Sequence, residues 1–138
     1  MRDPELALLV DRLMRRIHFG LQAQTADFDK MGVGPGGGII LITLAEMGQT
    51  GLNELTKRVA RDKSQMTRTM RSLERKGLVE RQPSANDGRV TMVSLTEEGE
   101  TVVGELMEAV TNVIDDLFKP ISQDERQTLK DLLRRVAS

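Results

Sequence analysis

The sequence contains no cysteine, tryptophan or tyrosine, and it has three phenylalanines and a single histidine, His18. Without cysteine the chain has no disulfide, no thiolate nucleophile, no thiolate zinc site and no thiol redox switch. One histidine cannot form a multi-histidine metal site within one chain. These absences exclude several classes of enzyme and redox sensor, and we expect no metal and no cofactor.

Long apolar runs are also missing. No run approaches the roughly 18 residues that cross a bilayer, and charges interrupt the N-terminal segment where a signal peptide would have an apolar core. We therefore expect a cytoplasmic protein without a membrane partner. Carboxylates are plentiful, but no pair is isolated in an apolar setting as acid–base catalysis requires, so we expect no enzyme and no catalytic residues.

The charge is unevenly distributed along the 138 residues, although the net charge is only −1. Residues 57–89 contain ten basic and four acidic side chains, a net charge of +6, and the remainder contains ten basic and seventeen acidic side chains, a net charge of −7. A chain with one electropositive segment is attracted to phosphates through that segment and repelled elsewhere.

The first half of the chain shows helical spacing interrupted by glycine. Apolar residues predict an amphipathic helix from about residue 4 to 28, with Pro4 in its first turn. Residues 32–38 break this pattern, and we expect residues 34–38 to be a flexible connector, because no Gly-Lys-Ser/Thr follows that would make a phosphate loop. Residues 39–47 favour a buried helix; the isoleucines alone would also fit a strand.

Two short helices and a hairpin follow. Thr50 is expected to cap a helix over residues 52–59, and Asp62 with Gln65 resembles a capping box that opens a second helix ending at Gly77. Residues 78–82 and 90–95 predict two strands joined by a long tip. Thr96 then opens a long helix that Pro120 ends, and Ser122 with Glu125 opens the last one.

The helix over residues 62–76 has two different faces. At about 100° per residue, Met66, Met70 and Leu73 fall on one side. The opposite side carries Ser64, Arg68, Arg71 and Arg75, flanked by Gln65 and Thr67. A helix packed on one side, with arginines and small polar groups on the other, fits the major groove of DNA, because guanidinium groups match guanine acceptors and phosphates. Alone, such a face would more often be a solvated surface.

The hairpin places a second basic group near this helix. Arg89 lies at its tip, where it could enter an adjacent groove. Asp87, two residues earlier, either holds the Arg89 guanidinium or serves only the turn, and we favour the former. Together these features predict a winged helix-turn-helix.

The chain resembles the MarR (multiple antibiotic resistance regulator) family. The resemblance rests on residues 52–60 (LNELTKRVA), 64–68 (SQMTR), 73–81 (LERKGLVER), 87–89 (DGR) and 93–99 (VSLTEEG). It covers about half of the chain, and the flanking helices extend it to nearly all. The glycine-rich residues 34–38 depart from the family's pattern.

The resemblance implies a mainly α fold with a small β-hairpin wing. It implies a single domain over residues 1–138, with a DNA-binding lobe at about 33–99 and dimerisation helices at about 4–30 and 100–138. It also implies that Ser64, Gln65, Thr67, Arg68 and Arg71 face the major groove, while Arg89 enters the minor groove beside Asp87. A homodimer would bind a pseudo-palindromic operator with half-sites about one helical turn apart.

The sequence thus predicts a transcription regulator, more often a repressor than an activator, that binds double-stranded DNA. A small-molecule effector bound between the dimer helices and the lobe is a further expectation, and the residues do not identify it. The alternative is a winged-helix module whose basic face binds an acidic protein. Salt-dependent binding to a defined palindromic duplex would separate the two.

Overall fold

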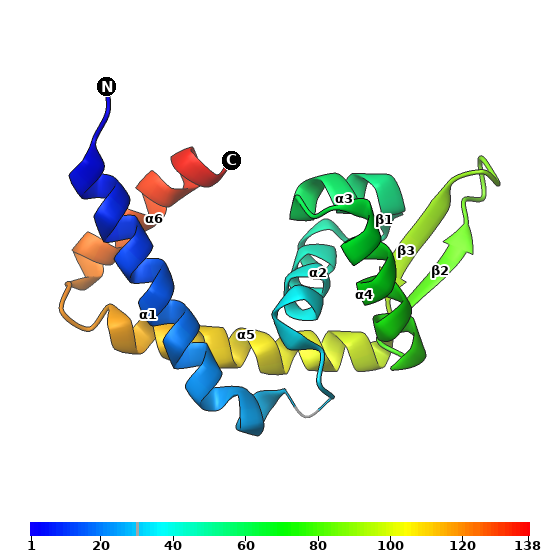
Figure 1. The fold of residues 1–138 in the computed structure, drawn as a ribbon, viewed down its shortest axis with the longest axis horizontal. Coiled ribbons are helices and arrows are strands. Elements are labelled where there is room, and N and C mark those ends of the chain that lie inside the picture. The colour runs from blue at the N-terminus through cyan, green and yellow to red at the C-terminus, as the bar shows by residue number, and fades with distance from the viewer. Residues whose placement is uncertain (30) are drawn as a thin grey trace. The chain divides into compact units, whose positions relative to one another are not determined.

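The computed structural model describes residues 1–29 and 31–138, with residues 25–28 as backbone only. It is mainly helical with a small antiparallel sheet, as predicted (Figure 1). The elements in chain order are α1 (Pro4–Phe28), α2 (Gly34–Met47), β1 (Thr50–Gly51), α3 (Leu52–Val59), α4 (Lys63–Arg75), β2 (Val79–Pro83), β3 (Thr91–Leu95), α5 (Glu97–Leu117) and α6 (Gln123–Ala137).

These elements form two compact units. The winged-helix lobe is Thr25–Glu108, and the terminal unit combines Met1–Gln24 with Ala109–Ser138. The unit boundaries lie inside α1 and α5 rather than in loops.

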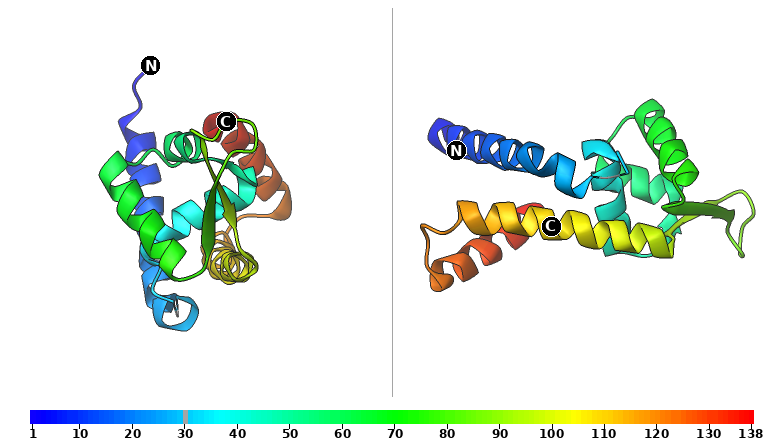
Figure 2. Two further views of the ribbon diagram at one scale, coloured as in Figure 1. Left: turned by 90° about the vertical axis from the view of Figure 1, so that its right-hand side faces the viewer. Right: turned by 90° about the horizontal axis from the view of Figure 1, so that it is seen from below.

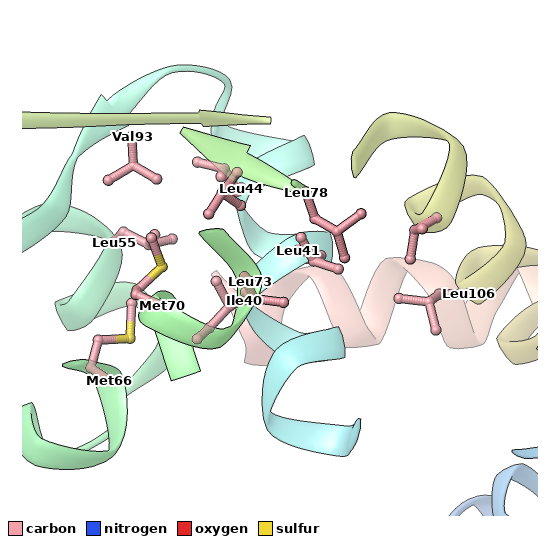
Figure 3. Packing of buried hydrophobic residues seen from close by; sticks show 12 residues of the cluster. Ile40, Leu41, Leu44, Leu55, Met66, Met70, Leu73, Leu78, Val93 and Leu106 are labelled. Atoms are coloured by element: carbon pink, nitrogen blue, oxygen red, sulfur yellow. The ribbon is translucent and has the colours of Figure 1, made fainter. Parts of the chain in front are cut away.

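The core of the lobe is built where α2, α3, α4, the sheet and the first turns of α5 meet. Its buried side chains include Ile40, Leu41, Leu44, Leu55, Met66, Met70, Leu73, Leu78, Val93 and Leu106 (Figure 3). Met66, Met70 and Leu73 are at most 3% exposed, so the predicted packing face of α4 is confirmed. Burying these side chains is the main stabilising contribution to the position of α4.

The sheet has three strands in the order β1-β3-β2, and both pairings are antiparallel. The predicted hairpin is confirmed: Arg81 lies opposite Val93, and Val79 lies opposite Leu95. We call residues 79–95 the wing; its tip extends away from the helices of the lobe (Figures 1 and 2). The prediction that Thr50 caps α3 was wrong, because Thr50 lies in β1 opposite Val93, and Gly51 is the N-cap residue.

The root of the wing is held by the start of α5. Gly77 ends the turn after α4 with φ of 75°, and the Leu78 N–H donates to the Leu73 carbonyl at 3.0 Å. Thr96 donates its hydroxyl hydrogen to the Gly77 carbonyl (2.6 Å) and accepts from the Gly99 N–H (3.0 Å) as the predicted cap of α5. A Cβ on Gly99 would lie 2.0 Å from the Leu78 carbonyl oxygen, so only glycine fits there.

The prediction of a flexible connector at residues 34–38 was wrong, because α2 begins at Gly34. The Asp29 carboxylate accepts from the N–H groups of Val33 (2.8 Å) and Gly34 (3.1 Å), which satisfies donors that a helix N-terminus leaves free. The glycines also let neighbours approach closely: a Cβ on Gly36 would lie 2.6 Å from the Arg61 guanidinium. Close packing thus offsets the low helix propensity of glycine.

The terminal unit contains α1, the second half of α5 and α6. Gly20 lets α1 approach α5, since a Cβ there would lie 2.9 Å from a methyl carbon of Val113. After the turn at Pro120, α6 runs back beside α5 (Figure 2), and Arg126 pairs with Asp115 at 3.0 Å. The predicted capping box is present, and the Ser122 N–H that donates to Glu125 lowers the pKa of that carboxyl.

Much of the apolar surface of this unit is exposed. The exposed large apolar side chains on its two terminal helices are Leu6, Leu8, Leu9, Val10, Met14, Phe19, Leu132, Leu133 and Val136. In the part of the chain that the structure describes, no helix is long and apolar enough to span a membrane.

Candidate nucleic-acid interface

The start of α4 is fixed by its N-cap. Asp62 has extended backbone angles, and its Oδ1 accepts from the Gln65 N–H at 2.8 Å. Within the described residues the reciprocal bond from the Gln65 side chain is absent, so half of the predicted capping box forms. This cap fixes the first turn of the helix, and with it the positions of Ser64 and Gln65.

The solvent face of α4 carries the predicted contact residues. All six are exposed, and we call them the basic face: Ser64, Gln65, Thr67, Arg68, Arg71 and Arg75. Among the described residues none of the three arginines has an ion-pair partner. Thr67 donates its hydroxyl hydrogen to the Lys63 carbonyl at 2.8 Å, which leaves that oxygen as an acceptor.

Lys63 is a further candidate for contact with DNA that was not among the residues predicted from the sequence. With Ser64, Thr67 and Arg68 it lines an open hollow of about 390 Å³ on the first two turns of α4. Its place in the basic segment and its spacing of four residues from Thr67 could have indicated it.

Other cations of the basic segment are held by the protein itself. Lys76 donates to the Gly32 carbonyl (3.2 Å) and the Ser72 hydroxyl (3.1 Å), and Arg81 pairs with Glu74 (2.5 Å). Lys57 pairs with Glu54 at 3.7 Å. Within the described part of this segment, exposed cations without an ion pair remain on α4, at Lys63, Arg68, Arg71 and Arg75, and on α3, at Arg58.

The wing tip holds the last two predicted residues. Asp87 Oδ1 accepts from the Arg89 N–H (3.0 Å) and lies 3.4 Å from Arg89 Nε, so it serves both the turn and the side chain. The Arg89 side chain remains 94% exposed. The lobe thus presents a helix face and one arginine on an extended hairpin, the two elements that a winged helix inserts into DNA grooves.

Comparison with known proteins finds a family match for the part of the chain that contains the candidate site. The model of the MarR family matches residues 39–91, which contain α3, α4 and most of the wing. This segment is similar to the MarR family. A curated relative, the HTH-type transcriptional regulator YdgJ of Bacillus subtilis, is 29% identical over 97 residues; the match covers 70% of this chain and 59% of the relative.

Solved structures share the MarR fold. The regulator PcaV of Streptomyces coelicolor, in complex with its natural ligand, is 25% identical, with a TM-score of 0.71 and coverage of 99% of this chain and 97% of that one. A MarR variant from E. coli complexed with operator DNA is 24% identical, with a TM-score of 0.71 and full coverage of both chains. The family and fold predictions are confirmed.

The described residues offer no alternative metal chemistry. They include no group of three or more histidine, cysteine, aspartate or glutamate side chains that could hold a metal ion. The candidate site is the exposed face of α4 together with the wing tip.

Proposed function

We propose that the chain is a transcription regulator that binds a specific double-stranded DNA site through α4 and the wing, with no catalytic step. The observation that carries this proposal is the basic face, with three unpaired arginines on the outer side of a helix whose inner side is fully buried. In this role the base edges and phosphates of the major groove are contacted by Ser64, Gln65, Thr67, Arg68 and Arg71. The sugar-phosphate backbone of the DNA is contacted by Lys63 and Arg75.

Arg89 is assigned to the minor groove. Its guanidinium is held beside Asp87 at the end of a hairpin that extends from the lobe. A cation on such a tip is attracted by the negative potential of a narrow minor groove, which A·T-rich sequences favour.

The proposed regulator is a homodimer. The exposed apolar side chains of α1 and α6 are buried against the same helices of a second copy in a two-fold arrangement. Two-fold symmetry makes the operator a pseudo-palindrome with half-sites about one helical turn apart.

Selection of bound sequences from a random duplex pool tests DNA binding, symmetry and spacing together. We expect a pseudo-palindromic site whose affinity falls as salt rises. An acidic protein as the partner of the same face, the alternative function, predicts instead that no duplex is enriched. The match of residues 39–91 to the MarR family model and the similarity to an HTH-type transcriptional regulator favour the DNA regulator.

We further propose that a small-molecule effector modulates the binding of this regulator to DNA. PcaV, one structural relative, was solved with its natural ligand. Within the terminal unit, α1 and α5 line a cavity of about 900 Å³ that contains apolar and basic side chains, including Phe19, Val113, Arg12 and Arg16. An effector must favour one spacing of the two α4 helices over another. Titrating small organic acids into the protein–operator complex, with Arg16→Ala as the matched variant, tests this part separately.

A further inference from the structure

One ion pair links the end of α4 to the wing. Glu74 lies in the last helical turns of α4, and Arg81 lies in β2 on the far side of the turn at Gly77. Arg81 Nε is 2.5 Å from Glu74 Oε1. Arg81 follows the buried Val79 by two residues, so both side chains point to the same side of the strand, toward the lobe.

The carboxylate of this pair depends on the arginine. Glu74 Oε1 is buried and has no hydrogen-bond partner among the described residues, so the ion pair with Arg81 is its described polar contact. A buried charged oxygen without a partner is unfavourable, so Glu74 favours the position of Arg81 that keeps the guanidinium beside it. Both side chains are still about one-third exposed, at 36% for Arg81 and 30% for Glu74.

Arg81 is the outermost side chain of β2 with a described ion pair to the lobe. The next two residues of the strand, Gln82 and Pro83, are exposed. The tip beyond them is closed on itself, through the Ser84 N–H that donates to the Val90 carbonyl (2.8 Å) and through the Arg89–Asp87 pair. The direction of the wing therefore depends on its root, on the pairing of β1 with β3 at Val93 and Met92, and on the Glu74–Arg81 pair.

We propose that the Glu74–Arg81 pair is a brace that sets the angle between the wing and α4, so that Arg81 is a positioning residue and not a phosphate contact. This inference rests on the proposed DNA-binding function. A wing held at a fixed angle can place Arg89 in the minor groove while α4 occupies the major groove. A wing that is free to move loses conformational entropy on binding and binds more weakly.

The test uses the opposite charges of the two residues. If each acted only through its charge, Arg81→Ala would weaken binding to the selected operator and Glu74→Ala would strengthen it, since DNA repels a carboxylate. If the pair is a brace, both variants weaken binding, each by several-fold and up to about tenfold, and the double variant is no weaker than either single one. Fluorescence anisotropy with a labelled operator measures all three.

Glu80→Ala is the matched control. Glu80 is an exposed carboxylate on β2, the strand that carries Arg81, and it has no described ion pair. Glu80→Ala therefore removes the same negative charge as Glu74→Ala but leaves the Glu74–Arg81 pair intact. We expect Glu80→Ala to bind as well as the wild type or better. Glu74→Gln, which keeps the size of the side chain, guards against a folding defect, and circular dichroism with thermal unfolding checks every variant.

Two further measurements distinguish a role of Arg81 in positioning the wing from a role only in the stability of the lobe. Arg81→Ala should leave the salt dependence of binding unchanged, whereas loss of a phosphate contact lowers the log–log slope by about 1. Arg89→Ala should weaken binding about tenfold in the wild type and much less in the Glu74→Ala background, since the wing is already misplaced there. Arg68→Ala should weaken operator binding by the same factor in the wild type and in the Glu74→Ala background.

The brace is refuted if Glu74→Ala binds the operator more tightly than the wild type, or if the effects of Glu74→Ala and Arg89→Ala on binding are additive. Neither result contradicts the proposed DNA-binding function. If the wild type selects no duplex, the proposed function fails, and the brace fails with it.

Discussion

At the scale of single residues, the cations of the basic segment divide by whether the protein already holds them. Lys76 and Arg81 are bonded to groups of the lobe, and Arg68 and Arg71 are not. A side chain with an internal partner must break that contact before it binds a phosphate, whereas an unpaired arginine loses only water. Unpaired arginines on α4 should therefore supply most of the binding free energy.

Replacing either Arg68 or Arg71 by alanine should weaken operator binding by about tenfold or more, because each loses a charge-assisted contact in the major groove. The unfolding temperature should stay the same, since both side chains are exposed and unpaired. Arg134→Ala on α6, which belongs to the terminal unit, makes the same charge change and should bind almost normally. Equal losses in all three variants would refute a specific role for the α4 face.

Arg89→Ala should lower affinity mainly for operators with A·T-rich flanking positions, where a narrow minor groove attracts the guanidinium. Repeating the duplex selection with the variant measures this position by position. A uniform loss across all flanking sequences would instead assign Arg89 to a phosphate contact.

The two faces of α4 could be predicted because they depend only on helical periodicity, which places Met66 and Met70 opposite Arg68. The partners of Lys76 and Arg81 could not be predicted in the same way. The Gly32 carbonyl lies 44 residues from Lys76 in sequence, and no local pattern brings the two together. The sequence therefore indicated which residues are basic, and the fold determines which of them are free.

At the scale of elements, two predictions failed for physical reasons. Glycine at residues 34–38 indicated a connector, but Asp29 caps the chain there and close packing near Arg61 and Leu73 favours a helix. Thr50 looked like a helix cap, but it pairs with Val93 in a strand of two residues. Such a short strand has no periodicity of its own and exists only because β3 lies beside it.

The docking of α5 against the wing root gives a prediction at this scale. Gly99→Ala should lower the free energy of unfolding by about 1–3 kcal/mol, because its Cβ would overlap the Leu78 carbonyl oxygen and force α5 and the wing root apart. Gly104→Ala, in the same helix with open space around it, should instead raise that free energy by roughly 0.5–1 kcal/mol. Urea unfolding of both variants measures the difference; equal effects would mean that α5 is not closely docked there.

At the scale of the whole molecule, the charge and the apolar surface are segregated between the two units. The +6 segment, residues 57–89, lies within the winged-helix lobe, and the terminal helices carry most of the exposed large apolar side chains. On α1, Leu6, Leu9, Val10 and Met14 recur at helical spacing and form a stripe, whereas Leu8 and Phe19 lie on the opposite side of the helix. Such a stripe on a surface favours association with another apolar helix face.

Leu9→Glu and Leu133→Glu, one on each terminal helix, should therefore convert the proposed dimer into a monomer, because each places a charge in an apolar interface. Sedimentation velocity measures the change in mass. Each variant should also lose most of its affinity for a duplex with two half-sites, since the two lobes are no longer linked and the gain from effective concentration disappears. Leu133→Met keeps the apolar surface and should remain dimeric. A wild type that sediments as a monomer while binding a two-half-site operator would overturn the dimer and assign this stripe to another partner.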